Sequence, residues 1–193
     1  TPGYDFPFSP KDIEIINAMD FLRDQQTDEG SIAGIAVTAW TAMAISAAEE
    51  DPQNWGNLVN YLMDKTSLLD SDKATDWERQ LLAIVACNEN PRNFAGIDFI
   101  EKIQSFYDGN QIGETVNIYD DIFGIISLIS SGFDKNDDII QSTKSFIINK
   151  QNTNGGWGDA DSTAAAIIAL ISAGQSINSK PISDGLSFLK TLQ

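Results

Sequence analysis

The chain has 193 residues, 42% of them hydrophobic, and its 28 acidic against 12 basic residues give a formal net charge of −16. This length and hydrophobic content suit one packed domain, or a piece of a larger protein. The acidic balance argues against nucleic-acid binding, and no apolar run approaches the ~18–20 residues that span a bilayer. The chain has no His and one Cys, Cys87, so it lacks the commonest general base and any thiolate zinc cluster.

Residues 1–10 hold three prolines and three aromatic residues and predict an extended N-terminal arm, which leaves 11–193 as the folded domain. Ser9-Pro10 is typical of the start of a helix. The rest of the chain reads as helical hairpins, each with a first helix, a polar or glycine-containing turn and a second helix. The predicted helices span 13–26 and 35–48, 55–68 and 75–86, 94–106 and 118–129, 137–151 and 161–173, and a last first helix begins near residue 181.

The hairpins repeat. Thr38, Trp77, Asp121 and Thr163 occupy equivalent places in successive second helices, a period of about 40 residues that indicates stacked helical hairpins. First helices are amphipathic, whereas second helices such as 35–48 are almost wholly apolar. We therefore predict an all-α fold, an α/α toroid or incomplete toroid of about four and a half hairpins, with the apolar helices inside. A right-handed α-solenoid is the alternative.

One sequence motif marks the repeat. Its most complete copy, F-I-x-x-x-Q-x-x-x-G-x-W at 146–157, resembles the Gln–Trp repeat of squalene–hopene and oxidosqualene cyclases, and a second copy begins at Phe21. The resemblance is to the prenyltransferase/squalene-oxidase repeat superfamily and implies its toroidal fold. We expect the glutamines to bond to backbone and tie repeats together, and the tryptophan to stack on the neighbouring repeat. The structural motif residues are Phe146, Gln151, Gly155, Trp157, Gln26 and Gly30.

The activities of that superfamily need residues that this chain mostly lacks. Protein prenyltransferases bind zinc through Asp, Cys and His, and thioester domains need Gly-Cys-Gly-Glu-Gln, whereas Cys87 lies in Val-Ala-Cys-Asn-Glu. Class II terpene cyclases use Asp-x-Asp-Asp-Thr-Ala, which D-A-D-S-T-A at 159–164 resembles. The resemblance would make Asp161 the general acid, beside Asp159. The competing interpretation is that Asp161 caps its helix.

Polar residues also gather at the starts of the second helices, which a toroid places around one opening. They are Asp76, Glu78, Tyr119, Asp120, Asp121, Asp159 and Asp161. They are either helix caps and solvated acids, or a rim that binds a cationic ligand or a hard cation such as Ca²⁺. Trp40 and Trp77 lie on the predicted inner helices with Phe123 one repeat on, and they either line a central cavity for an apolar ligand or fill it.

The leading hypothesis is therefore a non-enzymatic ligand- or protein-binding module within a secreted or cell-surface protein, with a cytoplasmic location as the alternative. It predicts no cofactor, no metal, no nucleic acid and no membrane insertion, and an apolar small molecule or a protein as partner. A terpene-cyclase-like enzyme that uses Asp161 is one alternative, and a carrier that holds an apolar molecule in the ring is another. The candidate ligand-binding residues are Trp40, Trp77, Tyr119, Asp120, Asp121 and Phe123.

Overall fold

The computed structural model describes residues 8–193, so most of the predicted N-terminal arm, residues 1–7, lies outside the described residues. The described part is all-helical and contains no named β-strand, which confirms the predicted class. Its α-helices are α1 (Ile13–Asp24), α2 (Ile35–Ala47), α3 (Leu58–Asp64), α4 (Ala74–Ala86), α5 (Phe99–Gln104), α6 (Ile118–Ser130), α7 (Asp138–Asn149), α8 (Ala160–Ser172) and α9 (Lys180–Lys190).

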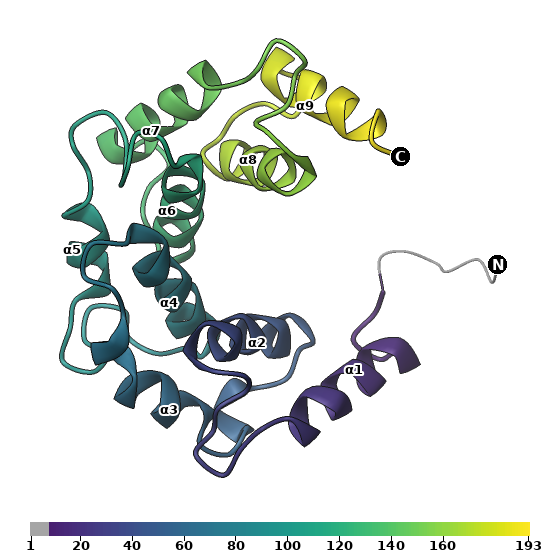
Figure 1. Cartoon of the computed structure of the whole chain (residues 1–193), viewed down its shortest axis with the longest axis vertical. Helices are drawn as coiled ribbons and strands as arrows, with labels where there is room; N and C mark the ends of the chain where they lie inside the picture. Colours follow the sequence, from purple (N-terminus) through teal and green to yellow (C-terminus); the bar gives the residue numbers. More distant parts are fainter. Residues whose placement is uncertain (1–7) are drawn as a thin grey trace.

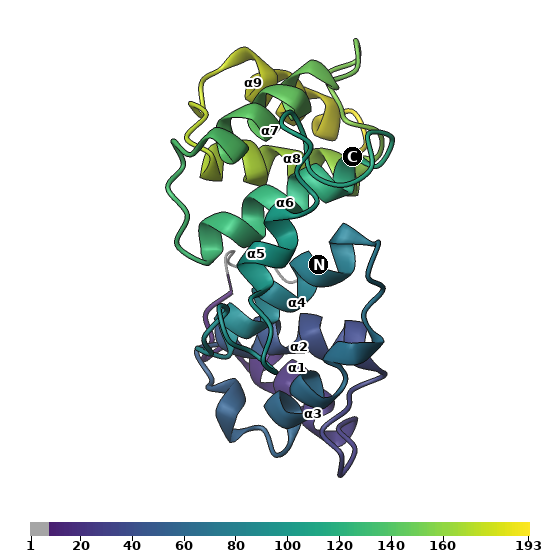
Figure 2. The same ribbon diagram turned by 90° about the vertical axis from the view of Figure 1, so that its left-hand side faces the viewer.

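The helices form two curved rows (Figure 1). α2, α4, α6 and α8 make the inner row, in which each helix packs against the next, and α1, α3, α5, α7 and α9 lie outside them. The rows trace an open arc, with α1 and the C-terminal end of the chain on its open side. From the side, the helices follow one another along the long axis, from α1–α3 at one end to α7–α9 at the other (Figure 2). The described chain is therefore an arc of helical hairpins.

The composition of the inner helices explains their position. α2 carries no charged residue, and its alanines Ala39 and Ala42 are fully buried, which lets neighbouring backbones approach closely. Larger side chains such as Leu81 and Ile125 are fully buried too, and each such burial stabilises the fold by roughly 1.5–3 kcal/mol. The inner helices are not buried all round, however. α2 and α8 keep an exposed strip that includes Trp40 and Ile168, which are 46% and 56% exposed.

Several helix boundaries differ from the predictions. α1 begins at Ile13, after Asp12, so Ser9-Pro10 does not start it. The region predicted as one helix over 55–68 instead holds α3 and the 3₁₀ turn Thr66–Leu68, and another 3₁₀ turn, Pro52–Asn54, precedes it. α5 begins later than predicted because Phe94 and Ile97 pair across a tight turn in which both central residues have positive φ. Asp98 then caps α5 by accepting from the N–H groups of Ile100 and Glu101.

The Gln–Gly part of the repeat motif joins one hairpin to the next. The amide of Gln151 donates to the carbonyl of Gly155 in its own turn and to that of Pro181 in α9, both at 2.8 Å. Gln26 makes the matching bond to the carbonyl of Trp55, at 3.0 Å. Trp157 packs on α9 as well, because a Cβ built on Gly185 would lie 3.0 Å from its ring.

The four aligned positions of the second helices share a role. Each bonds to the turn that precedes its helix, so a polar or indole side chain is needed at this position. Thr38 accepts the N–H of Ile32 at 2.8 Å, and Thr163 accepts that of Trp157 at 3.0 Å. The remaining two contacts run from the Ile112 N–H to Asp121 at 3.0 Å and from the Trp77 indole to the Asp70 carbonyl at 2.8 Å.

Candidate binding site

Three aromatic side chains meet on the inside of the arc. The ring of Trp40 in α2 meets that of Phe123 in α6, with centroids 5.8 Å apart in an edge-to-face arrangement. In the inner row, α4 lies between these two helices. Tyr119, one turn earlier in α6, stacks on Phe123 at 6.3 Å. Because Trp40 and Phe123 come from non-adjacent inner helices, the curvature of the inner row is what brings their rings together.

A chain of hydrogen bonds continues from this cluster to α8. The Tyr119 hydroxyl lies 2.7 Å from Ser162 Oγ, which itself donates to Asp159 Oδ1 at 2.7 Å. Asp159 also accepts the Ser162 N–H at 2.8 Å and is the N-cap of α8. These bonds hold the pKa of Asp159 below its ordinary value, so it is an ionised cap.

The cluster borders a hollow of about 290 Å³, here called the aromatic hollow. Besides Trp40 it is lined from α4 and α6. The lining residues are Trp40, Thr75, Arg79, Asn117, Tyr119 and Phe123. Arg79 is its one charged residue, and the guanidinium donates to Asp76 Oδ1 at 2.8 Å. The aromatic hollow is therefore a mostly apolar surface whose cationic wall is already paired.

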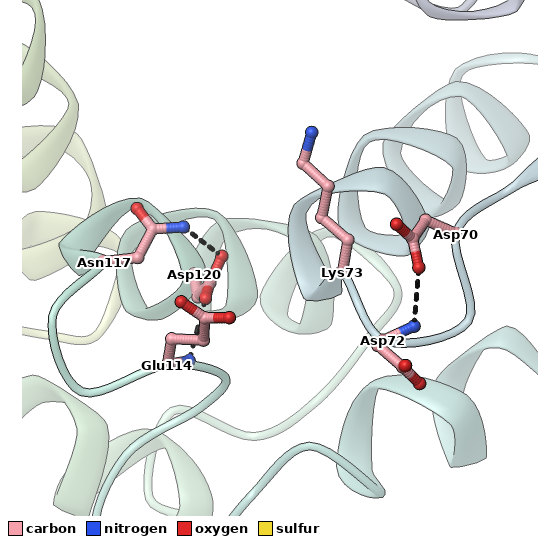
Figure 3. A pocket seen from close by; sticks show the side chains of 6 residues that line it. All are labelled: Asp70, Asp72, Lys73, Glu114, Asn117 and Asp120. Atoms are coloured by element: carbon pink, nitrogen blue, oxygen red, sulfur yellow. Dashed lines mark hydrogen bonds between the residues drawn. The ribbon is translucent and has the colours of Figure 1, made fainter.

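A second hollow of about 270 Å³, here called the acidic hollow, lies beside the first (Figure 3). Its residues come from the turn before α4 and from the start of α6. They are Asp70, Asp72, Lys73, Glu114, Asn117 and Asp120. Lys73 extends away from the carboxyl groups of Asp70 and Asp72, and its Nζ lies 3.9 Å from Asp76 Oδ1. Four acidic residues thus line this hollow against one lysine.

Asn117 lines both hollows and so joins them. It is the N-cap of α6, where its Oδ1 accepts the Tyr119 N–H at 3.3 Å and its Nδ2 donates to Asp120 at 2.8 Å. Asp120 also accepts the Glu114 N–H at 2.9 Å. This approach requires glycine at Gly113, since a Cβ there would lie 2.4 Å from Asp120 Oδ2. Burial raises the pKa of Asp120 above its ordinary value.

Two further carboxyl groups lie buried in α4 and α6. Glu78 is fully buried and neither of its oxygens has a partner, while Asp121 uses only Oδ1, on the Ile112 N–H. Burial, followed by the nearby charges of Asp120 and Asp121, raises the pKa of Glu78 well above its ordinary value. Burial also raises the pKa of Asp121 to about 7. Glu78 fits where Gly124 leaves room, because a Cβ there would lie 3.2 Å from Glu78 Oε1.

Of the candidate ligand-binding residues, the structure brings Trp40, Tyr119 and Phe123 to the aromatic hollow and Asp120 to the adjoining acidic hollow, but it places others elsewhere. Trp77 is 7% exposed and its ring packs on Phe99 of α5, 5.3 Å away, so it faces the outer row and lines neither hollow. Asp161 is exposed in the first turn of α8 and does not cap it as expected, because the N-cap is Asp159. Within residues 8–193 no three acidic or Cys side chains are arranged to hold a metal ion.

Sequence reasoning missed seven lining residues, namely Asp70, Asp72, Lys73, Thr75, Arg79, Glu114 and Asn117. Asn117 carried a usable signal, because an Asn directly before an apolar helix is a common N-cap. The other lining residues could not be predicted from the sequence, since their exposure to a hollow depends on how α4, α6 and the turns before them are oriented.

A scan against protein-family models, a search of curated proteins and a search of solved structures each found no match to this chain. Among the described residues, no helix combines the length and the apolar character needed to cross a bilayer.

Proposed function

We propose that this chain is a non-catalytic binding module, and that its arc is part of an α/α toroid of the prenyltransferase/squalene-oxidase repeat kind. The motif residues of the repeat support the second part, because Gln26 and Gln151 make corresponding contacts between hairpins. The strongly acidic composition supports a place in an exported or cell-surface protein. The inside of the arc is the surface that binds.

The exposed aromatic hollow carries the proposal. Trp40 is 46% exposed, although core tryptophans such as Trp55 are almost fully buried. Of the tryptophans, all within the described part, Trp40 alone has no acceptor for its indole N–H; the others donate to Glu50, Asp70 and Ile147. A large apolar ring left in water, clustered with two others over a hollow, is typical of a ligand-contact surface.

The geometry favours binding over the two alternatives. A cyclase acid needs an enclosed cavity, whereas Asp161 is exposed and lines neither hollow. A carrier needs to enclose its ligand, and a hollow of about 290 Å³ is at the lower end of the ~300–1,000 Å³ typical of ligand pockets. A single side chain or ring fits this volume better than a large apolar molecule.

The test is binding of the neutral apolar dye Nile red, followed by its fluorescence. We expect the protein to raise the dye fluorescence and Trp40→Ala to remove most of that rise, with an unchanged helical circular dichroism spectrum because Trp40 is half-exposed. Leu68→Ala is the control, since Leu68 is 69% exposed and lines neither hollow. Equal fluorescence with wild type, Trp40→Ala and Leu68→Ala would contradict the proposal.

A further inference from the structure

We propose that the occupant of the site is a basic peptide segment of a partner protein. An apolar side chain of the segment enters the aromatic hollow, and a neighbouring Lys or Arg enters the acidic hollow. This inference rests on the proposed function and names the partner class for the same surface.

The first support is the charge around the hollows. Four acidic residues line the acidic hollow, and its one lysine, Lys73, extends away from the carboxyl groups of Asp70 and Asp72. The guanidinium in the aromatic hollow is already paired, since Arg79 donates to Asp76 at 2.8 Å. The site therefore has unbalanced negative charge next to apolar rings, and a cation beside an apolar group complements both. The net charge of −16 also attracts basic segments over longer range.

The second support is the distance between the two subsites. Asn117 belongs to both hollows, so a ligand passes from one to the other over a single side chain. Successive residues of an extended peptide are spaced by roughly 3.3 Å, so side chains one or two residues apart can enter the two hollows on either side of Asn117. The faces of Tyr119 and Phe123 add cation–π attraction for a cation at the boundary between the hollows.

The third support favours a peptide over a small molecule. Apolar residues stay exposed on the inner row beyond the hollows, at Val37 in α2 and at Ile168 and Ile171 in α8. Both hollows are small, but these exposed apolar side chains offer further contact points on α2 and α8. A chain segment contacts such a surface at several points, whereas a small molecule covers only one.

The test uses three short, fluorescein-labelled peptides of equal length, which alternate Leu and Lys, Leu and Glu, or Ser and Lys, measured by fluorescence anisotropy. We expect the Leu/Lys peptide to bind more than about tenfold more tightly than either of the others, and its affinity to fall as salt is added. The double variant Asp72→Asn/Glu114→Gln should weaken it by about tenfold, because both carboxyl groups face the acidic hollow.

The matched control is Asp137→Asn/Asp138→Asn, which makes the same change in net charge on exposed residues at the start of α7. It should leave the affinity for the Leu/Lys peptide within about twofold of wild type. Equal weakening by both double variants would reduce the effect to net charge and overturn the inference. Equal binding of the Leu/Lys and Leu/Glu peptides would also overturn the inference. If Nile red binding still depended on Trp40 in that case, the proposed function would stand.

Discussion

At the scale of single residues, close contacts with the next hairpin explain why the repeat motif has glycine in its turn. Gly30 has φ +94°, and a Cβ there would lie 2.3 Å from the backbone of Asn57 in the next hairpin. Gly155 has φ +89° and would meet the Asp184 carbonyl of α9 at 2.6 Å. The glutamine of the motif bonds across the same junction. The motif is therefore a joint between hairpins.

Gly30→Ala should cost about 1–3 kcal/mol more in free energy of unfolding than Gly34→Ala, because only the first crowds another backbone. Gly34 is a close match in conformation, with φ +91°, but a Cβ there meets nothing within 4 Å. Urea unfolding of both variants, followed by circular dichroism, measures the difference. Equal losses would mean that strain in the turn itself, and not contact between hairpins, requires glycine at Gly30.

The residues also show what the sequence can and cannot predict. The repeated Gln and Gly of the motif correctly predicted a contact between repeats, because a side-chain amide at a fixed spacing from a turn glycine is suited to bonding backbone groups. The D-A-D-S-T-A stretch was ambiguous, since Asp159 and Asp161 both suit a helix start, and the structure makes Asp159 the cap. Trp77 was expected inside the arc, but the rotation of α4 turns it toward Phe99.

At the scale of elements, apolar composition predicted the inner helices well. The predicted 35–48, 75–86, 118–129 and 161–173 each lie within one residue of α2, α4, α6 and α8 at either end. The outer helices were harder, because local turn chemistry decides them. Thr66 bonds back to the Leu62 carbonyl at 3.0 Å where the chain leaves α3, and Asp98 starts α5 five residues later than predicted.

The buried acids of α4 and α6 make the stability of this junction depend on pH. The pKa of Glu78 and that of Asp121 are raised in the folded state, the latter to about 7, so folding favours their protonated forms. The loss of folding stability from ionising these two buried groups is absent below the unfolded pKa of about 4. It grows as pH rises toward the folded pKa values. The protein should therefore lose stability as pH rises from about 4 to about 7.

Glu78→Gln and Asp121→Asn remove the charge, and Asn can still accept the Ile112 N–H. Both should raise the melting temperature at about pH 8 and flatten its pH dependence, as thermal unfolding by circular dichroism would show. Asp138→Asn is the control, because it removes one negative charge equally, but at an exposed site. If Asp138→Asn raised the melting temperature as much, general repulsion among the acids would be the cause and not burial.

At the scale of the whole molecule, curvature creates the site. Trp40 and Phe123 are 83 residues apart in sequence, with α4 between their helices, and meet only because the inner row bends. Periodicity predicted stacked hairpins and which helices lie inside. Together with composition it led to a predicted toroid or incomplete toroid, which is a curved row. It could not predict a partly exposed inner face, because this depends on how neighbouring helices cross. Trp40 and Phe123 were predicted to line or fill the centre of a ring. In the structure they instead border a hollow at the surface.

The most direct test of a solvent-facing aromatic site is hydrogen exchange of the four tryptophan indole N–H groups, followed by NMR. The Trp40 signal, assigned by its loss in Trp40→Phe, should exchange with water fastest, since the other three indoles are hydrogen-bonded. It should also be the indole signal that shifts most when the Leu/Lys peptide is added. A Trp40 signal as protected as the others, and unmoved by the peptide, would contradict the account.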